Sequence, residues 1–323
     1  MKQIFKVFLS SLLALTLTAL PAMGAQTNVF VSIMPQKYFV EQIGKDLVNV
    51  DVLVMPGANP HMYEPSPKQM TQLSKAKAYF SIGITLEETW IPRIKSANSA
   101  LQVFETDHGI TKIAMVAHHH EEHGENHEAH EHEHAMHEHS EEHEHAMHGH
   151  AEEHGHHEHK GLDPHVWLSP ARVKIIASNI CAGLVEIDPA NKLAYERNLA
   201  AFIREIEKTD KAIADKLAMV PKNRRSFLVF HPSWGYFADQ YGLTQITIEE
   251  EGNEPSPKHL AEIIEHGQEL DIHVVFVQPQ FSRKNAQVIA DELGAQVLPL
   301  DPLAEDWKKN LLDATDAFVD ALR

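Results

Sequence analysis

The stretch SFLVFHPSWGYFADQYGLTQITIE, residues 226–249, decides the fold class. It contains two short runs, SFLVF and LTQITIE, that are rich in the aromatic and β-branched residues typical of strands. The residues between them carry helix signals. A strand, a helix and a second strand in this order form the repeating unit of a parallel sheet. The stretch therefore indicates an α/β protein.

Runs of the same kind occur eight times along the chain, in two groups of four. The first group is NVFVSI (28–33), VNVDVLV (48–54), AYFSIG (78–83) and LQVF (101–104), and the second is SFLVF (226–230), LTQITIE (243–249), HVVFVQ (273–278) and AQVLPL (295–300). Helix signals separate the runs within each group. We therefore predict two α/β lobes, each with a roughly four-stranded parallel sheet flanked by helices.

A repeated pentapeptide supports an internal relation between the two lobes. EPSPK occurs at residues 64–68 and again at 254–258, each time after the second strand of its group. In each copy the serine is suited to the N-cap of a helix and the following proline to its first turn. The matched positions favour a pseudo-repeat over chance.

One long amphipathic segment separates the two groups of strands. Its apolar residues recur at helical spacing, and Pro189 and Pro221 bracket it. They are Leu199, Phe202, Ile203, Ile206, Ile213 and Leu217. We predict a linking helix over 189–220, between a lobe at 26–188 and a lobe at 221–323. Thirty helical residues span roughly 45 Å, which is long enough to run across both lobes. Such a rigid helix predicts slight rocking of the lobes rather than a wide hinge closure.

The N-terminus has the pattern of a secretory signal. Lys2 and Lys6 precede the apolar run VFLSSLLALTLTAL, and the small residues of PAMGAQ follow. We predict cleavage after Gly24 or Ala25, so that residues 1–25 are removed and the protein is exported to the periplasm. A membrane anchor is the alternative, but the run is shorter than the ~20 residues needed to cross a bilayer. The single cysteine, Cys181, excludes an internal disulfide and suits a small buried residue in a helix.

Residues 118–160 form a histidine-rich run, predicted to be a disordered loop inserted in the first lobe. It holds 18 of the 25 histidines together with 13 glutamates and almost no apolar residue. Such a segment cannot bury enough surface to fold. It is expected to bind several divalent ions weakly, with a purely solubilising tract as the alternative. Much of the net charge of −18 resides here, and no basic pattern indicates nucleic-acid binding.

Four residues outside the run are candidate metal ligands. His61 follows the second strand, His231 follows the first strand of the second lobe, and Asp301 follows the last strand. His165 lies just before a helix start at Ser169. Ligands of open parallel sheets gather at the carboxyl ends of the strands, so two facing lobes would bring these residues into one cleft. Three histidines and one oxygen are a donor set for zinc, although each histidine alone also fits a structural, hydrogen-bonded role.

Five motifs, in order along the mature chain, resemble the substrate-binding proteins of metal-uptake ABC transporters, in particular the zinc-uptake (ZnuA-type) branch. They are PGANPHMYEPSPKQ, DPHVWLSP, VFHPSWGYFADQYGL, EEEGNEPSPKHL and VLPLDPLAEDW. The resemblance implies a zinc ion held between the lobes by His61, His165 and His231. Asp301 matches an aspartate that coordinates the metal in some members. Zinc would be the transported ligand, and the partners would be an inner-membrane permease with its cytoplasmic ATPase.

The resemblance also ranks the alternatives. Manganese-preferring relatives commonly carry a carboxylate at the position of His231, so the histidine here favours zinc. A periplasmic zinc buffer or metallochaperone, or the uptake of manganese or another divalent metal, is the alternative function. Periplasmic zinc metallochaperones are further candidate partners. A zinc hydrolase is disfavoured because no segment predicted to be helical carries an HExxH pattern and no obvious general base accompanies the site. We expect a monomer. Glu87 and Glu88 match an acidic position common in the family, and a favourable charge at a helix N-terminus explains them equally well.

Overall fold

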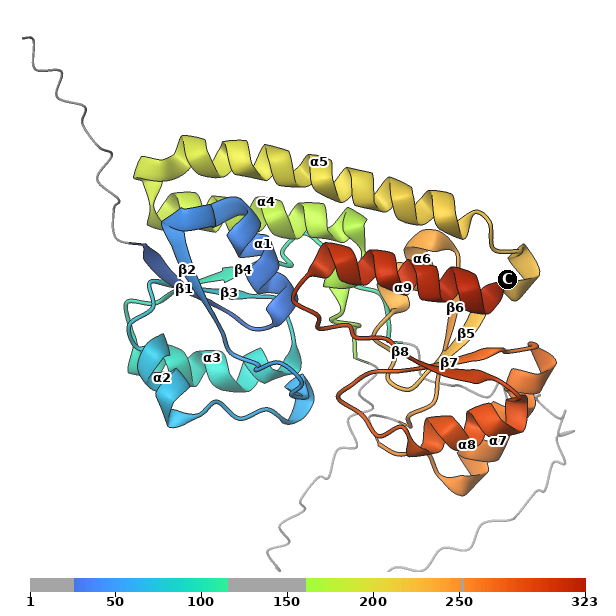
Figure 1. Ribbon diagram of the computed structural model, residues 1–323. Helices are drawn as coiled ribbons and strands as arrows, with labels where there is room; N and C mark the ends of the chain where they lie inside the picture. The colour runs from blue at the N-terminus through green and yellow to red at the C-terminus, as the bar shows by residue number, and fades with distance from the viewer. Residues whose placement is uncertain (1–25, 116–160, 251–252) are drawn as a thin grey trace, which may run out of the picture.

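The computed structural model describes residues 26–115, 161–250 and 253–323, which form two parallel sheets (Figure 1). The strands are β1 (Thr27–Val31), β2 (Val48–Val52), β3 (Ala78–Ser81), β4 (Gln102–Glu105), β5 (Ser226–Val229), β6 (Thr244–Thr247), β7 (Val274–Val277) and β8 (Gln296–Pro299). Each falls within, or within one residue of, a predicted run. The sheet orders are β2-β1-β3-β4 and β6-β5-β7-β8, and every pairing is parallel. The predicted fold class is confirmed, and the matching strand orders agree with a pseudo-repeat.

Helices flank both sheets. They are α1 (Met34–Gly44), α2 (Pro67–Leu73), α3 (Thr85–Ala97), α4 (Pro170–Ile187), α5 (Lys192–Leu217), α6 (Gly235–Tyr241), α7 (Pro257–Glu269), α8 (Lys284–Leu293) and α9 (Trp307–Leu322). The two copies of EPSPK start α2 and α7, where the hydroxyls of Ser66 and Ser256 accept hydrogen bonds from backbone N–H groups of the first turn. The proline occupies the first helical position in both, as the repeat predicts.

The long helix α5 runs along one side of the molecule past both lobes (Figure 1). It begins three residues later than predicted, because Pro189–Asn191 form a 3-10 turn. Its 26 residues correspond to about 39 Å. Phe202, Ile206, Ile213 and Leu217 are buried, while Leu199 and Ile203 pack partly buried against the same core. The predicted apolar stripe therefore faces the rest of the protein.

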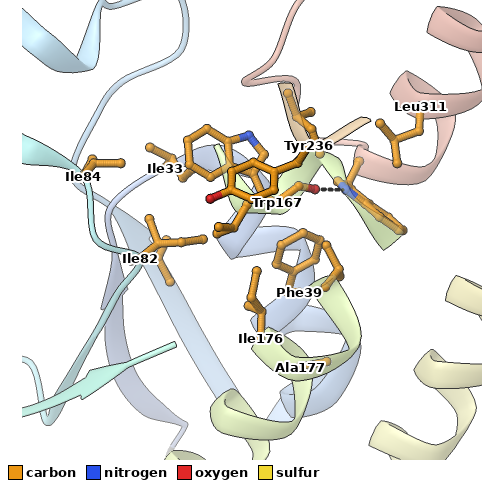
Figure 2. Packing of buried hydrophobic residues seen from close by; sticks show 14 of the residues in the cluster. Ile33, Phe39, Ile82, Ile84, Trp167, Ile176, Ala177, Tyr236 and Leu311 are labelled. Carbon is orange, nitrogen blue, oxygen red and sulfur yellow. Dashed lines mark hydrogen bonds between the residues drawn. The ribbon is translucent and has the colours of Figure 1, made fainter. Parts of the chain in front are cut away.

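Two tryptophans add a second connection between the lobes. The indole N–H of Trp167, next to α4, donates to the carbonyl of Pro302 at 2.8 Å. The indole N–H of Trp307, at the start of α9, donates to the carbonyl of Trp167 at 2.7 Å. Figure 2 shows Trp167 in one buried cluster with Phe39 of α1 and Leu311 of α9. This shared core and these two hydrogen bonds oppose large relative motion of the lobes.

Cys181 is buried in α4, as expected, and burial raises the pKa of its thiol. The signal sequence at 1–25 and the histidine-rich run at 118–160 lie outside the described residues. Within the described ranges, every helix is too short or too polar to cross a bilayer.

Candidate metal centre

His231 is held where two neighbouring strands of the second sheet end. It stands two residues after the last residue of β5, and Gln278 follows β7, the strand beside β5. The backbone N–H of His231 donates to Oε1 of Gln278 at 3.2 Å. The amide of Gln278 donates in return to the carbonyl of His231. Because Gln278 is fully buried, this exchange fixes the backbone from which the imidazole projects.

His165 is fixed by the turn that leads into α4. The 3-10 turn Val166–Leu168 follows it directly. Ser169 then caps α4, its hydroxyl accepting from the backbone N–H of Arg172 at 3.4 Å. The predicted helix start is therefore confirmed. His165 itself is only 5% exposed.

His61 lies in a 3-10 turn, Pro60–Met62, between β2 and α2. The side chain of Asn59 caps this turn by accepting from the backbone N–H of His61 at 2.9 Å. The same loop is bonded to the end of β2, because the side-chain amide of Gln69 donates to the carbonyl of Leu53 at 2.6 Å. His61 keeps more contact with solvent than the other two histidines, although its imidazole faces theirs.

The three histidines come together from segments far apart in the sequence. One ring nitrogen of each lies within 4.8 Å of those of the other two. The ring of His231 is 5.1 Å from that of His61 and 5.2 Å from that of His165, centroid to centroid. Nitrogens bound to tetrahedral zinc at 2.0–2.1 Å lie about 3.4 Å from one another. Small side-chain rotations would therefore close the cluster around one ion.

Two buried carboxylates orient these imidazoles. Oε1 of Glu249 lies 2.8 Å from Nδ1 of His231, and Oδ1 of Asp163 lies 2.7 Å from Nδ1 of His165. An ionised carboxylate only accepts hydrogen bonds, so each Nδ1 carries the proton and each Nε2 keeps a free lone pair. Nε2 of His231 is buried with no hydrogen-bond partner in the described structure. An unpartnered buried nitrogen of this kind fits a metal ligand.

The electrostatics favour neutral imidazoles. Loss of solvation, followed by the influence of His231 and His165, lowers the pKa of His61 to about 4. Burial also lowers the pKa of His165, and the carboxylate of Asp163 opposes this shift only in part. Both side chains are therefore unprotonated at neutral pH, which is the form that binds a metal ion.

Asp301 does not join the cluster of three histidines. Its Oδ1 accepts hydrogen bonds from the side-chain amide of Gln280 at 3.1 Å and from the backbone N–H of Leu303 at 2.9 Å. Gln280 and Leu303 both line the cavity that holds the histidines, and Asp301 lines the adjacent cavity. The carboxylate of Asp301 is therefore linked to the histidine cavity through Gln280 and Leu303. A ligand role for Asp301 stays a prediction.

Asp163 and Glu249 adjoin the centre, although no sequence motif singled them out as part of it. Asp163 had a local signal, because it stands two residues before His165 in DPHVWLSP. Glu249 had none, since it meets His231 only through the pairing of β5 with β6. Glu87 is buried at the start of α3, where it accepts hydrogen bonds from the backbone N–H groups of Ile82 and Gly83. Desolvation raises its pKa to about 7, and its hydrogen bonds brace the loop beside the cavity.

We expect Glu249→Gln to weaken zinc binding about tenfold or more, which is the usual scale for a partner of a metal-binding imidazole. A neutral amide oxygen can still accept from Nδ1 of His231, but it supports the bound imidazole less than a carboxylate does. Zinc affinity measured by chelator competition tests this. Glu250→Gln is the control, because Glu250 is exposed. Equal affinities for the two variants would contradict the role assigned to Glu249.

Comparisons with known proteins agree with this geometry. The family model described as zinc-uptake complex component A, periplasmic (ZnuA) matches residues 29–323. The high-affinity zinc uptake system protein ZnuA of Bacillus subtilis is 31% identical over 304 residues, covering 93% of this chain and 85% of that protein. The zinc-binding lipoprotein AdcA of Streptococcus pneumoniae is 30% identical, with 100% of this chain matched to 61% of that longer protein.

A solved structure extends the likeness to three dimensions. A ZnuA deletion mutant with zinc bound is 38% identical and superimposes with a TM-score of 0.76, covering 92% of this chain and 98% of the other. The family match spans nearly all of the chain and includes every residue of the histidine cluster. The chain belongs to the family of periplasmic zinc-uptake component A proteins, ZnuA.

Proposed function

We propose that this protein is the zinc-binding component of an ABC uptake transporter. It captures Zn²⁺ between the two lobes and delivers the ion to an inner-membrane permease driven by a cytoplasmic ATPase. The convergence of His61, His165 and His231 is the observation that carries the proposal. One ring nitrogen of each lies within 4.8 Å of those of the other two, and a buried carboxylate lies within hydrogen-bond distance of Nδ1 of both His165 and His231.

The donor set favours zinc over manganese. Three neutral imidazoles present nitrogen, which suits zinc, whereas manganese prefers carboxylate and water oxygen. The two nearest carboxylates, Asp163 and Glu249, hydrogen-bond to imidazoles. We propose Asp301 or a water molecule as the fourth ligand. For Asp301 to bind, its hydrogen bond with Gln280 would have to open.

The cellular setting follows from the family and the N-terminus. The family is described as periplasmic, and residues 1–25 have the pattern of a cleavable signal. We propose export to the periplasm and function as a monomer. The relatives are described as zinc-uptake and zinc-binding proteins, which supports binding and transport over catalysis. A buffer or metallochaperone role without a permease is not favoured.

We propose that residues 118–160 collect divalent ions weakly and that the tight site lies elsewhere. Replacing this run with a short linker should then leave one tight zinc site and remove only the additional weak ones, because His61, His165 and His231 are all anchored outside it. Calorimetric titration of the mature protein, with and without the run, measures both classes of site. In the related ZnuA structure, zinc is bound although residues 138–173 of that protein are deleted.

The titration has a clear opposing outcome. If the shortened chain kept its fold by circular dichroism but lost tight binding, the histidine-rich run would itself be the transport site. A His61→Ala variant of the full-length chain is the matched control, since it should lose the tight site and keep the weak ones.

A further inference from the structure

We propose that Tyr236 is a positioning residue for zinc binding. Its hydroxyl clamps together the two chain ends that flank residues 116–160, and through Asp163 it keeps His165 aimed at the metal. The inference rests on the proposed zinc site and deepens it. It identifies how the second lobe isolates one ligand from a long insertion that begins and ends only a few residues away.

The two chain ends form a short antiparallel stem. Ala114 and Leu162 face each other in a β-bridge. The backbone N–H of Met115 donates to the carbonyl of Gly161 at 3.1 Å, and that of Asp163 donates to the carbonyl of Ile113 at 2.8 Å. These few hydrogen bonds are all that pairs the ends directly in the described part of the chain. So short a ladder is marginal without further support.

Tyr236 supplies that support from the opposite lobe. Its hydroxyl donates to the carbonyl of Asp163 at 2.8 Å and accepts from the backbone N–H of Ile113 at 3.1 Å. One hydroxyl thus bonds both strands of the stem. The side chain is fully buried, and the guanidinium of Arg172 lies 4.5 Å above its ring. Figure 2 places Tyr236 in the same buried cluster as Trp167.

The clamp connects to the metal centre through Asp163. Oδ1 of Asp163 accepts from the backbone N–H of His165 at 2.8 Å and lies 2.7 Å from its Nδ1. Behind it, a Cβ on Gly235 would lie 2.6 Å from Oδ2 of Asp163, so only glycine allows this close approach. The segment 231–236 therefore provides the ligand His231 and, five residues later, the clamp that orients His165.

The length of the insertion explains why a clamp is needed. From 116 to 160 the chain adds 45 residues between two ends that must stay paired. Holding together two chain positions that many residues separate has an entropic cost, and that cost acts on the stem that holds the ends. Without the hydroxyl of Tyr236, fraying of the stem would reach Asp163 and release the imidazole of His165. A short turn in register with the stem would remove most of this entropic cost.

The experiment combines Tyr236→Phe with closure of the stem. In one background the chain is full length. In the other, residues 116–160 are replaced by Asn-Gly, because the hydrogen-bonded pair Met115 and Gly161 is in register for a two-residue turn. Zinc affinity is measured by competition with a chromophoric chelator, and the thermal unfolding midpoint is measured without metal. Tyr195→Phe is the matched control, since Tyr195 is also fully buried and its hydroxyl donates to Asp188, away from the stem.

We expect Tyr236→Phe to weaken zinc binding about tenfold in the full-length chain and less than about threefold in the closed chain. Tyr195→Phe should lower the unfolding midpoint similarly in both backgrounds and leave the affinity unchanged. Equal losses of affinity from Tyr236→Phe in both backgrounds, or no loss in either, would overturn the clamp while leaving the zinc site intact. If the unsubstituted chain bound no zinc tightly, the proposed function itself would fail, and the clamp with it.

Discussion

His231→Ala should weaken tight zinc binding by more than about a hundredfold, beyond the 10–100-fold typical of residues that only support a ligand. The ring of His231 lies close to those of both other histidines, and its Nε2 is buried with no hydrogen-bond partner among the described residues. Its removal leaves two ligands and a buried carboxylate, Glu249, with no imidazole to hold. Water fills such a gap poorly. Chelator competition on the purified mature protein measures the loss.

The same titration ranks the other candidates. His61→Ala and His165→Ala should also lose tight binding, and Asp301→Ala should lose less, because water can replace a carboxylate oxygen in a tetrahedral site. The hydrogen bonds that Asp301 makes with Gln280 and Leu303 agree with this order. A larger effect from Asp301→Ala than from all three histidine variants would reverse the assignment. Circular dichroism of each variant separates loss of the site from loss of the fold.

Zinc affinity should hold between pH 7.5 and about 6 and then fall steeply as the pH decreases further. Free imidazole has a pKa of about 6.5, but burial lowers the pKa of His165 and loss of solvation lowers that of His61 to about 4. Protons therefore compete with zinc only at lower pH than they would for exposed histidines. Competition titrations from pH 7.5 to 4 measure the curve. Affinity that stayed flat to pH 4 would be incompatible with a three-histidine site.

The metal-free protein should lose stability over the same range. A histidine whose folded-state pKa is lowered binds its proton more readily when the chain is unfolded. His61 therefore favours unfolding progressively as the pH falls from about 6.5 towards 4. Above about pH 6.5 His61 is neutral in both the folded and the unfolded chain, so this loss of stability is absent there. Denaturant unfolding at several pH values tests whether the free energy of unfolding falls as the pH falls. His61→Ala is the control for the contribution of this histidine.

Local patterns in the sequence predict much of the architecture. The eight strands, the capping serines Ser66, Ser169 and Ser256, and the stripe on α5 are each set by neighbouring residues or by a fixed period, so a one-dimensional pattern contains them. The cluster of His61, His165 and His231 was also predictable. Each stands at or near a strand end or a helix start, and the rule that ligands gather at the carboxyl ends of parallel strands places them together.

Tertiary contacts decide how those histidines are held and what else reaches them. Glu249 meets His231 only because β6 pairs with β5, and Tyr236 meets the stem 73 residues before it only because α6 packs across the lobe boundary. The same is true of Asp301, whose carboxylate is turned towards Gln280 by a hydrogen bond between two loops. Such contacts depend on the packing of whole elements and leave no period or spacing in the chain. Local sequence patterns thus identify the candidate ligands, whereas the packing of whole elements sets the hydrogen bonds that orient their imidazoles.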